Sequence, residues 1–242
     1  MIVLGIETAT PVRGVGVVEE ERILGEVTLE DSESLFSSLD SLLKEIHIEL
    51  KDVDGFAISI GPGSFTGLRV GLATAKGLAM VTGRPLLAVP TLDALADSAN
   101  LILNQVQDQI SNLKFIICPI LDARKGEVYG CFYRRSTGNP PKADCGTLER
   151  VSEYWVLPPK DLIERVERLG EEILFFGTGL EVYRKMISDH LGERVHLLKP
   201  NFLAPSPAQV AQIGLRRLQR GEVEDVNHLE PFYIRSSQVG VG

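Results

Sequence analysis

The stretch Gly61-Pro-Gly-Ser-Phe-Thr-Gly-Leu-Arg-Val-Gly71 joins a short apolar run to a long helical pattern, and it decides how the chain is interpreted. Residues 56–60 before it predict a buried strand, and residues 66–82 within and after it predict a helix. A strand, a glycine-rich turn and a helix N-terminus are the usual geometry for holding an anion, because backbone N–H groups and the helix dipole converge there. Gly61, Gly63 and Ser64 are therefore candidate residues of an anion site or of a vestigial nucleotide site.

Two nucleotide-binding motifs are close to this stretch, but neither matches it. Gly61, Gly63 and Gly67 are spaced GxGxxxG and miss the dinucleotide fingerprint by one residue. Residues 71–77 have the length of a P-loop, but they end in Lys-Gly where that motif needs Gly-Lys followed by Ser or Thr. Neither motif supports a nucleotide site here.

The predicted helix has one face that is nearly bare of side chains. Its members recur every four residues: Gly67, Gly71, Ala75 and Ala79. Beside them lies an apolar face with Leu68, Leu72 and Leu78. A glycine inside a helix costs about 1 kcal/mol relative to alanine, and close approach of another backbone is a common reason for keeping it. Two interpretations stay open, which are packing inside this chain and a helix–helix interface with another subunit.

The rest of the chain indicates two similar halves. Strands are expected at 2–6, 14–18, 23–29, 56–60 and 86–89, with helices at 32–47 (carrying Leu35, Leu39 and Leu42), at 66–82 and from Thr91 onward. The second half predicts strands at 115–121, 127–133, 144–155 and 173–176, and helices at 160–169, 180–190 and from Ser206-Pro207 to Gly221. This order predicts an α/β protein with duplicated RNase H-like βββαβαβα lobes, as in the actin-like ATPase superfamily. We expect an N-terminal lobe of residues 1–110 and a C-terminal lobe of residues 111–242, whose last segment can return to the first lobe.

Composition limits the classes of function. The 242 residues hold 33 acidic and 25 basic side chains, a formal net charge of −8, which argues against a protein that grips nucleic acid by itself. Any tRNA contact is expected to be indirect, through a partner. The three cysteines, Cys118, Cys131 and Cys145, are odd in number and form no CxxC pair, which favours a reducing compartment. We expect a cytoplasmic protein without a membrane span or a signal peptide.

Four segments together resemble one known family. They are residues 6–10 (Ile-Glu-Thr-Ala-Thr), residues 61–79, residues 121–129 (Leu-Asp-Ala-Arg-Lys-Gly-Glu-Val-Tyr) and residues 231–235 (Pro-Phe-Tyr-Ile-Arg). In this order they closely resemble the TsaB (YeaZ) family. The resemblance implies a non-catalytic subunit needed for threonylcarbamoyladenosine (t6A) at tRNA position 37. Its implied partners are the paralogous transferase TsaD, which it binds and activates, and the ATPase TsaE, with a homodimer when it is isolated.

The resemblance also implies where the partner binds. In the family, pairing uses the helices that match segments 32–47 and 66–82. The expected interface residues are Leu35, Leu39, Leu42, Gly67, Leu68, Gly71, Leu72, Ala75 and Ala79. The sequence departs from the common pattern in two places. Glu7 stands where the family often has Asp, and residues 31–34 open the first helix where many relatives carry a histidine.

Catalytic and metal-binding residues are not expected in this chain. TsaD holds its metal with an HxxxH pair after the strand that matches residues 86–89, and here Thr91 and Leu95 occupy the matching positions. The four histidines, at positions 47, 190, 196 and 228, show no metal-ligand spacing. Relatives are sometimes labelled glycoproteases, but the chain has neither HExxH nor Gly-x-Ser-x-Gly. ATP or ADP and metal are expected on the partner subunits, and no cofactor in the isolated chain.

Glu7, at the end of the first strand, supports an alternative function. Actin-fold ATPases keep a metal-linked acid at this position, and Thr8 and Thr10 could bind phosphate beside it. The alternative is therefore an actin-fold ATP-dependent small-molecule kinase or ATPase. The preferred interpretation is that Glu7 only caps or orders the nearby turn.

Overall fold

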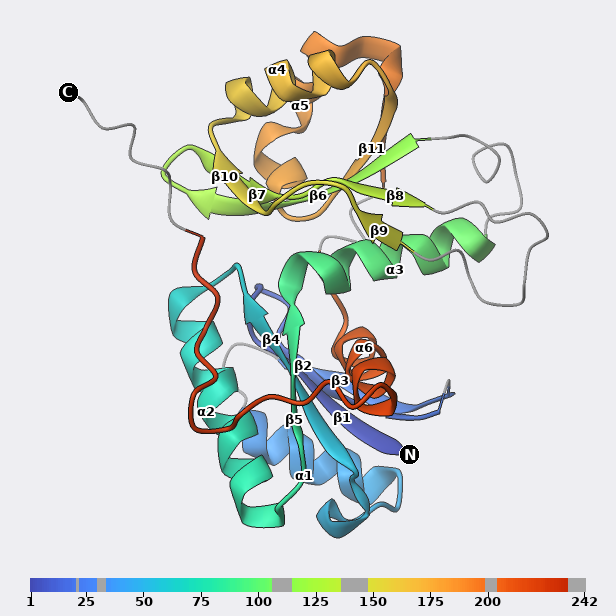
Figure 1. Cartoon of the computed structure of the whole chain (residues 1–242), viewed down its shortest axis with the longest axis vertical. Coiled ribbons are helices and arrows are strands. Elements are labelled where there is room, and N and C mark those ends of the chain that lie inside the picture. Colours follow the sequence, from blue (N-terminus) through green and yellow to red (C-terminus); the bar gives the residue numbers. More distant parts are fainter. Residues whose placement is uncertain (21, 30–33, 106–114, 136–147, 199–203, 235–242) are drawn as a thin grey trace. The chain divides into compact units, whose positions relative to one another are not determined.

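The structure is a computed structural model that describes residues 1–20, 22–29, 34–105, 115–135, 148–198 and 204–234. The chain forms two compact units (Figure 1). Unit 1 contains Met1–Ala94 and Ala204–Phe232, and unit 2 contains Leu95–Leu203 and Tyr233–Gly242. Sequence analysis places the division near residue 110, whereas the units divide inside helix α3 (Thr91–Gln105).

Unit 1 is built on a five-stranded sheet of order β3-β2-β1-β4-β5. The apolar strand β1 is central, pairing antiparallel with β2 and parallel with β4, because a strand buried on both faces needs a continuous apolar run. The strands are β1 (Ile2–Glu7), β2 (Gly14–Glu19), β3 (Arg22–Thr28), β4 (Gly55–Gly61) and β5 (Leu86–Pro90).

Helices cover both faces of this sheet, and Figure 1 shows α2 and α6 on opposite sides. Besides the first residues of α3, the helices of unit 1 are α1 (Leu35–Glu45), the 3-10 turn η1 (Leu50–Asp52), α2 (Phe65–Thr82) and α6 (Pro207–Gln219). Helices α1 and α2 share a core with Leu4 and Phe56, whereas α6 packs against Val3 and Ala57. The predicted start of α6 is confirmed, since the Ser206 side chain accepts a hydrogen bond from the Gln209 N–H.

Unit 2 contains a second sheet, whose main path has the order β10-β7-β6-β11-β12. Its strands are β6 (Phe115–Arg124), β7 (Glu127–Gly130), β8 (Tyr133–Arg135), β9 (Leu148–Arg150), β10 (Trp155–Leu157), β11 (Glu172–Phe176) and β12 (Val195–Leu197). Its helices are α4 (Pro159–Leu169), α5 (Gly179–Leu191) and the 3-10 turn η2 (Gly192–Arg194). Ile116, Trp155, Phe175 and Ile187 are among the buried residues of its core.

Two strands predicted for this unit are each divided in the structure. The predicted strand 127–133 is β7 and β8, separated at Cys131 and Phe132. The Phe132 N–H donates to the Ser152 hydroxyl at 2.9 Å instead of to the neighbouring strand, which interrupts the ladder. The predicted strand 144–155 corresponds to β9 and β10, and residues 144–147 lie outside the described residues.

The two sheets have the same topology. In each, three antiparallel strands precede two strands that pair in parallel, so β6, β7, β10, β11 and β12 repeat the order of β1, β2, β3, β4 and β5. Strands β8 and β9 are an addition to this plan. The prediction of an α/β protein with two duplicated RNase H-like lobes is confirmed.

Candidate functional site

The glycine-rich turn that follows β4 is packed against the chain's own C-terminal segment. Gly61 has a φ of 121°, which side-chain-bearing residues rarely adopt, and a Cβ placed there would overlap the carbonyl oxygen of Phe232. The Phe232 N–H donates to the carbonyl oxygen of Ile60 at 2.7 Å. The segment 222–232, red in Figure 1, runs beside β5 and α2 before it reaches this turn.

Backbone donors around the start of α2 already have partners within unit 1. The Ser64 N–H donates to the carbonyl oxygen of Ala9 at 2.7 Å, and the Gly67 N–H donates to the Ser64 hydroxyl at 3.2 Å. The Gly61 N–H donates to the Thr91 hydroxyl at 3.1 Å. Ser64 is thus the N-cap of α2, and these three donors are not available to an anion in this structure.

Glu7 is fully buried at the end of β1, with both carboxyl oxygens occupied. One oxygen accepts hydrogen bonds from the Ala9 N–H at 2.7 Å, the Thr10 N–H at 3.0 Å and the Thr10 hydroxyl at 3.3 Å. The other accepts a hydrogen bond from the Ser59 hydroxyl. Burial raises the pKa of Glu7 from 4.5 to about 7, against the opposing effect of the hydrogen bonds from Ser59, Thr10 and Ala9.

These residues do not fit a nucleotide–metal complex. An acid that holds a metal or its water must face an open site, and Glu7 is enclosed by its own chain. The Thr8 hydroxyl donates to the carbonyl oxygen of Gly67 at 2.8 Å, and the Thr10 hydroxyl lies 3.2 Å from the carbonyl oxygen of Val12. Within the described part of the chain, no cluster of three or more His, Cys, Asp or Glu side chains could hold a metal ion. The geometry agrees with the interpretation that Glu7 orders the turn after β1.

The bare face of α2 lies inside unit 1. A Cβ at Gly67 would overlap the carbonyl oxygen of Thr8, and a Cβ at Gly71 would overlap the Thr8 hydroxyl. We call the residues on this side the inner face of α2: Gly67, Gly71, Ala75 and Ala79. The leucines expected at the partner interface also belong to the core: Leu35, Leu39, Leu42, Leu68 and Leu72. Of the two open interpretations, packing within the chain therefore accounts for the small residues, and a partner must meet mainly other side chains of α1 and α2.

A second stripe on α2 faces outward and is also apolar. We call it the outer face of α2, and it consists of Val70, Ala73, Gly77, Met80 and Val81. Val70, Met80 and Val81 are 52%, 67% and 86% exposed, and a Cβ at Gly77 would meet open space. The spacing of three and four residues places this stripe along one side of the helix. The outward side of a surface helix is normally polar, so an exposed apolar stripe of this length is unusual.

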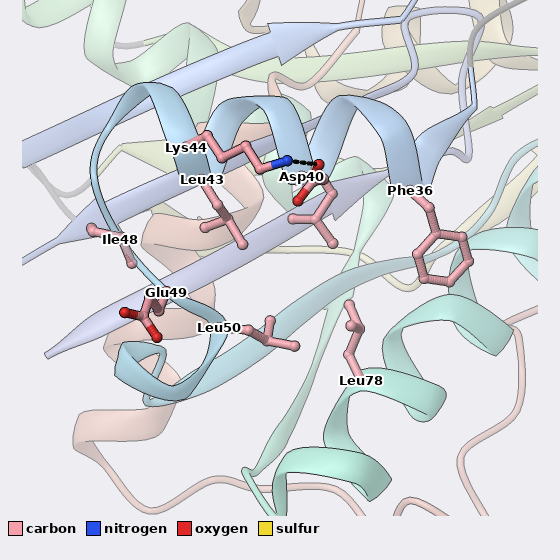
Figure 2. Close-up of a pocket in the computed structure, with 9 residues that line it drawn as sticks. Phe36, Asp40, Leu43, Lys44, Ile48, Glu49, Leu50 and Leu78 are labelled. Carbon is pink, nitrogen blue, oxygen red and sulfur yellow. Dashed lines mark hydrogen bonds and ion pairs between the residues drawn. The ribbon is translucent and has the colours of Figure 1, made fainter.

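A groove runs along α1 and the residues that follow it up to Leu50, and Leu78 of α2 lines its other side (Figure 2). Its volume is about 400 Å³, and it is lined by Phe36, Leu39, Asp40, Leu43, Lys44, Ile48, Glu49, Leu50 and Leu78. Figure 2 shows the Phe36 ring on the α1 side and Leu78 on the α2 side. An exposed ion pair between Lys44 and Asp40, at 2.6 Å, lies beside the apolar lining. Of the interface residues named from the sequence, Leu39 is the one that also lines this groove.

Sequence reasoning missed the outer face and the groove, although a signal for the outer face was present. The inner face drew attention because its glycines repeat every four residues, whereas the outer face combines Val, Ala, Gly and Met without a single pattern. The signal is the rarity of charge on every side of the helix, because Arg69 and Lys76 are the only charged residues between 65 and 82.

The other residues singled out in the sequence have local roles. The imidazole of His196 lies 2.9 Å from the Glu172 carboxylate and that of His228 lies 2.7 Å from the Asp225 carboxylate. Cys118 and Cys131 are buried thiols, and Cys145 and residues 31–33 lie outside the described residues. The Thr91 hydroxyl accepts a hydrogen bond from the Gly61 N–H, and Leu95 is buried. No helix in the described ranges is long and apolar enough to cross a membrane.

Comparisons with known proteins agree with the resemblance. Residues 26–241 match the family model described as "TsaD: tRNA N6-adenosine threonylcarbamoyltransferase". The tRNA threonylcarbamoyladenosine biosynthesis proteins TsaB of Bacillus subtilis and of Escherichia coli are each 27% identical to this chain, over 98% of it and 96% of their own length. The fold is that of YeaZ from Pseudomonas aeruginosa, which superposes with a TM-score of 0.72 at 24% identity, covering 96% of this chain and 99% of that one.

The family match covers nearly the whole chain, and the relatives found over the same length carry the TsaB name. The chain therefore belongs to the TsaD family, and within it to the TsaB (YeaZ) proteins.

Proposed function

We propose that this protein is a non-catalytic subunit in the formation of t6A at tRNA position 37. It binds the transferase TsaD and keeps it in an active conformation. The observation that carries this proposal is the outer face of α2, an exposed apolar stripe on a helix whose other side is already buried in the core. Exposed apolar surface of this kind marks a site where another protein binds.

The docking surface of this proposal combines the outer face of α2 with the α1–α2 groove. Phe36, which lines the groove and is 58% exposed, and Phe65, which begins α2 and is 56% exposed, add aromatic area to it. Buried aromatic and aliphatic anchors usually supply most of the binding energy of an interface. The partner is the transferase because this chain matches the transferase family model from residue 26 to residue 241, so the partner has the same helices to offer.

The chemistry of the reaction is assigned to the partners. Glu7, Thr8 and Thr10 are engaged in hydrogen bonds that order the turn after β1, which argues against a catalytic nucleotide site in unit 1. The proposal assigns ATP or ADP and the metal to TsaD and TsaE, and tRNA contact to the assembled complex. The alternative, an actin-fold kinase or ATPase, predicts magnesium-dependent ATP binding and hydrolysis by this chain alone, which calorimetry and a phosphate-release assay would detect.

The docking surface is tested by titrating the chain into TsaD of the same organism in a calorimeter. Val70→Glu is expected to weaken binding by about 100-fold, because it places a carboxylate in an apolar contact where no partner awaits it. Stimulation of t6A synthesis should fall with it at limiting concentrations of the chain.

Val182→Glu is the matched control. Val182 is 59% exposed on α5, the helix of unit 2 that holds the same topological position as α2. This variant should bind as the wild-type chain does. Equal affinities for wild-type chain and Val70→Glu would rule out this surface, and no affinity of the wild-type chain would rule out the proposed function itself.

A further inference from the structure

The end of β1 connects a buried acid to the helix that carries the outer face. Glu7 accepts three hydrogen bonds from the turn of residues 8–10, two from backbone N–H groups and one from the Thr10 hydroxyl. Its other oxygen is fixed to β4 through the Ser59 hydroxyl. The side chain of Glu7 therefore connects the turn to β4 in the middle of the sheet, and strand pairing does not make this connection.

The same turn is the surface on which α2 lies. The Ala9 carbonyl oxygen accepts a hydrogen bond from the Ser64 N–H at 2.7 Å, and the Thr8 hydroxyl donates to the Gly67 carbonyl oxygen at 2.8 Å. Gly63, Gly67 and Gly71 each lack a Cβ where one would overlap Ala9 or Thr8. A change in the turn of even a few tenths of an ångström is therefore transmitted to α2, because packed backbones leave no room between them.

The fold alone does not explain an acid at this position. Ile6 pairs with Ile58, so Glu7 faces Ser59, two residues before Gly61. The matching pair in unit 2 is Cys118 and Phe175, two residues before Gly177. The second sheet thus has a thiol and an aromatic ring at the matching positions, and both are buried. A buried carboxyl group is a costly alternative, so its presence in unit 1 needs another reason.

We propose that Glu7 is a positioning residue. Through the turn of residues 8–10 it fixes the position of α2 on the sheet. It thereby holds the outer face of α2 in the orientation that the transferase binds. Glu7 itself touches no partner. This inference rests on the proposed function for its docking consequence, whereas the ordering of α2 by Glu7 can be measured in the isolated chain.

Hydrogen–deuterium exchange of the full chain tests the ordering. Glu7→Met has a similar length and no acceptor, and it should speed exchange of the amides of residues 9, 10 and 64 by about tenfold, the effect of losing one backbone hydrogen bond. Glu7→Gln keeps an acceptor oxygen for the two backbone donors, and it should restore exchange to within about threefold of wild type.

Affinity for the transferase, measured with the same variants, tests the docking consequence. Glu7→Met should bind about tenfold more weakly, a loss that follows from the reduced fraction of chains with α2 in place, and Glu7→Gln should bind as wild type does. Leu215→Ala is the control for general destabilisation, because it opens a cavity under α6 on the other face of the sheet. It should leave affinity unchanged at temperatures where unit 1 is folded.

The outcomes separate the two proposals. Unchanged exchange at residues 9, 10 and 64 in Glu7→Met overturns the positioning role, and so does faster exchange without any loss of affinity. If the wild-type chain itself fails to bind the transferase, the proposed function is wrong, and the exchange experiment alone still decides whether Glu7 orders α2.

Discussion

Each unit of this molecule contains a strand, a glycine-rich turn and a helix at the same topological position, and the two versions are built differently. In unit 1, β4 leads through Gly61 and Gly63 to α2, and in unit 2, β11 leads through Gly177 to α5. Gly61 and Gly177 both have positive φ angles, of 121° and 104°, and a Cβ on either would overlap a backbone carbonyl oxygen. The turn itself is therefore a property of the fold.

The helices that follow these turns differ in what they expose. Helix α5 buries Leu180, Ile187 and Leu191 and exposes Glu181, Lys185 and Asp189 among others, as an ordinary surface helix does. Helix α2 buries its small residues against the turn after β1 and exposes the outer face. Unit 2 has the same fold with an ordinary surface helix at α5. The apolar outer face and the acid at Glu7 are therefore not required by the fold, and they need a functional explanation.

The largest effect is expected from matched alanine substitutions on the two helices. Gly67→Ala should destabilise unit 1 by about 3 kcal/mol, because its Cβ overlaps the Thr8 carbonyl oxygen and a backbone group cannot rotate away. Gly179→Ala should cost about 1 kcal/mol or less, since its Cβ meets only the side chain of Ile120, at 3.0 Å or more.

Urea unfolding measures both costs. The single tryptophan of the chain, Trp155, is buried in the core of unit 2, so its fluorescence follows that unit, and far-ultraviolet circular dichroism follows the whole chain. Equal losses of unfolding free energy in the two alanine variants would show that the inner face of α2 is packed no more tightly than α5.

The next effect concerns the dependence of stability on pH. The pKa of Glu7 is raised from 4.5 to about 7 in the folded chain, chiefly by burial, so the folded state favours the neutral carboxyl. Below pH 4.5 both states are protonated and the burial has no ionisation cost. Between pH 4.5 and about 7 the unfolded chain ionises first, and unit 1 loses stability, by about 3 kcal/mol in total. Above pH 7 the loss levels off.

Glu7→Gln has no carboxyl group and should lack this dependence. The difference in unfolding free energy between wild type and Glu7→Gln, measured in urea at pH 5, 6, 7 and 8, should therefore shift in favour of the variant as the pH rises. Other titrating groups cancel in this difference. Parallel pH profiles for the two chains would mean that Glu7 is ionised or solvated in the same way in the folded and unfolded states.

The sequence was sufficient for the fold, but not for which side of helix α2 faces solvent. Apolar runs and turn residues located β1, β4, α2 and α6, because each pattern is local. The divided strands β7–β8 and β9–β10 depend on a long-range hydrogen bond from Phe132 to Ser152, which no local pattern reports. The role of Gly67 and Gly71 likewise depends on Thr8, more than fifty residues away, so the sequence left intramolecular packing and a partner interface equally open.

The smallest expected effect separates folding from docking on the outer face. Gly77 lies in the middle of α2 with nothing near the position of its missing Cβ, so the fold gives it no reason to be glycine. Gly77→Ala should raise the stability of the isolated chain by up to about 1 kcal/mol, because alanine loses less backbone entropy in a helix. Under the proposed function the same methyl group lies between α2 and the partner, and it should weaken binding severalfold.

A stabilising substitution that weakens binding cannot be explained by damage to the fold, which makes Gly77→Ala informative despite its size. Ser188→Ala provides the comparison on α5, where an exposed serine is replaced at a helix position of unit 2. It should also raise stability slightly, by about 0.5 kcal/mol or less, and leave binding to the transferase unchanged. If Gly77→Ala stabilises the chain and binds as tightly as wild type, the partner does not approach the backbone of α2 at this turn, and the contact must lie toward Val70 and the α1–α2 groove.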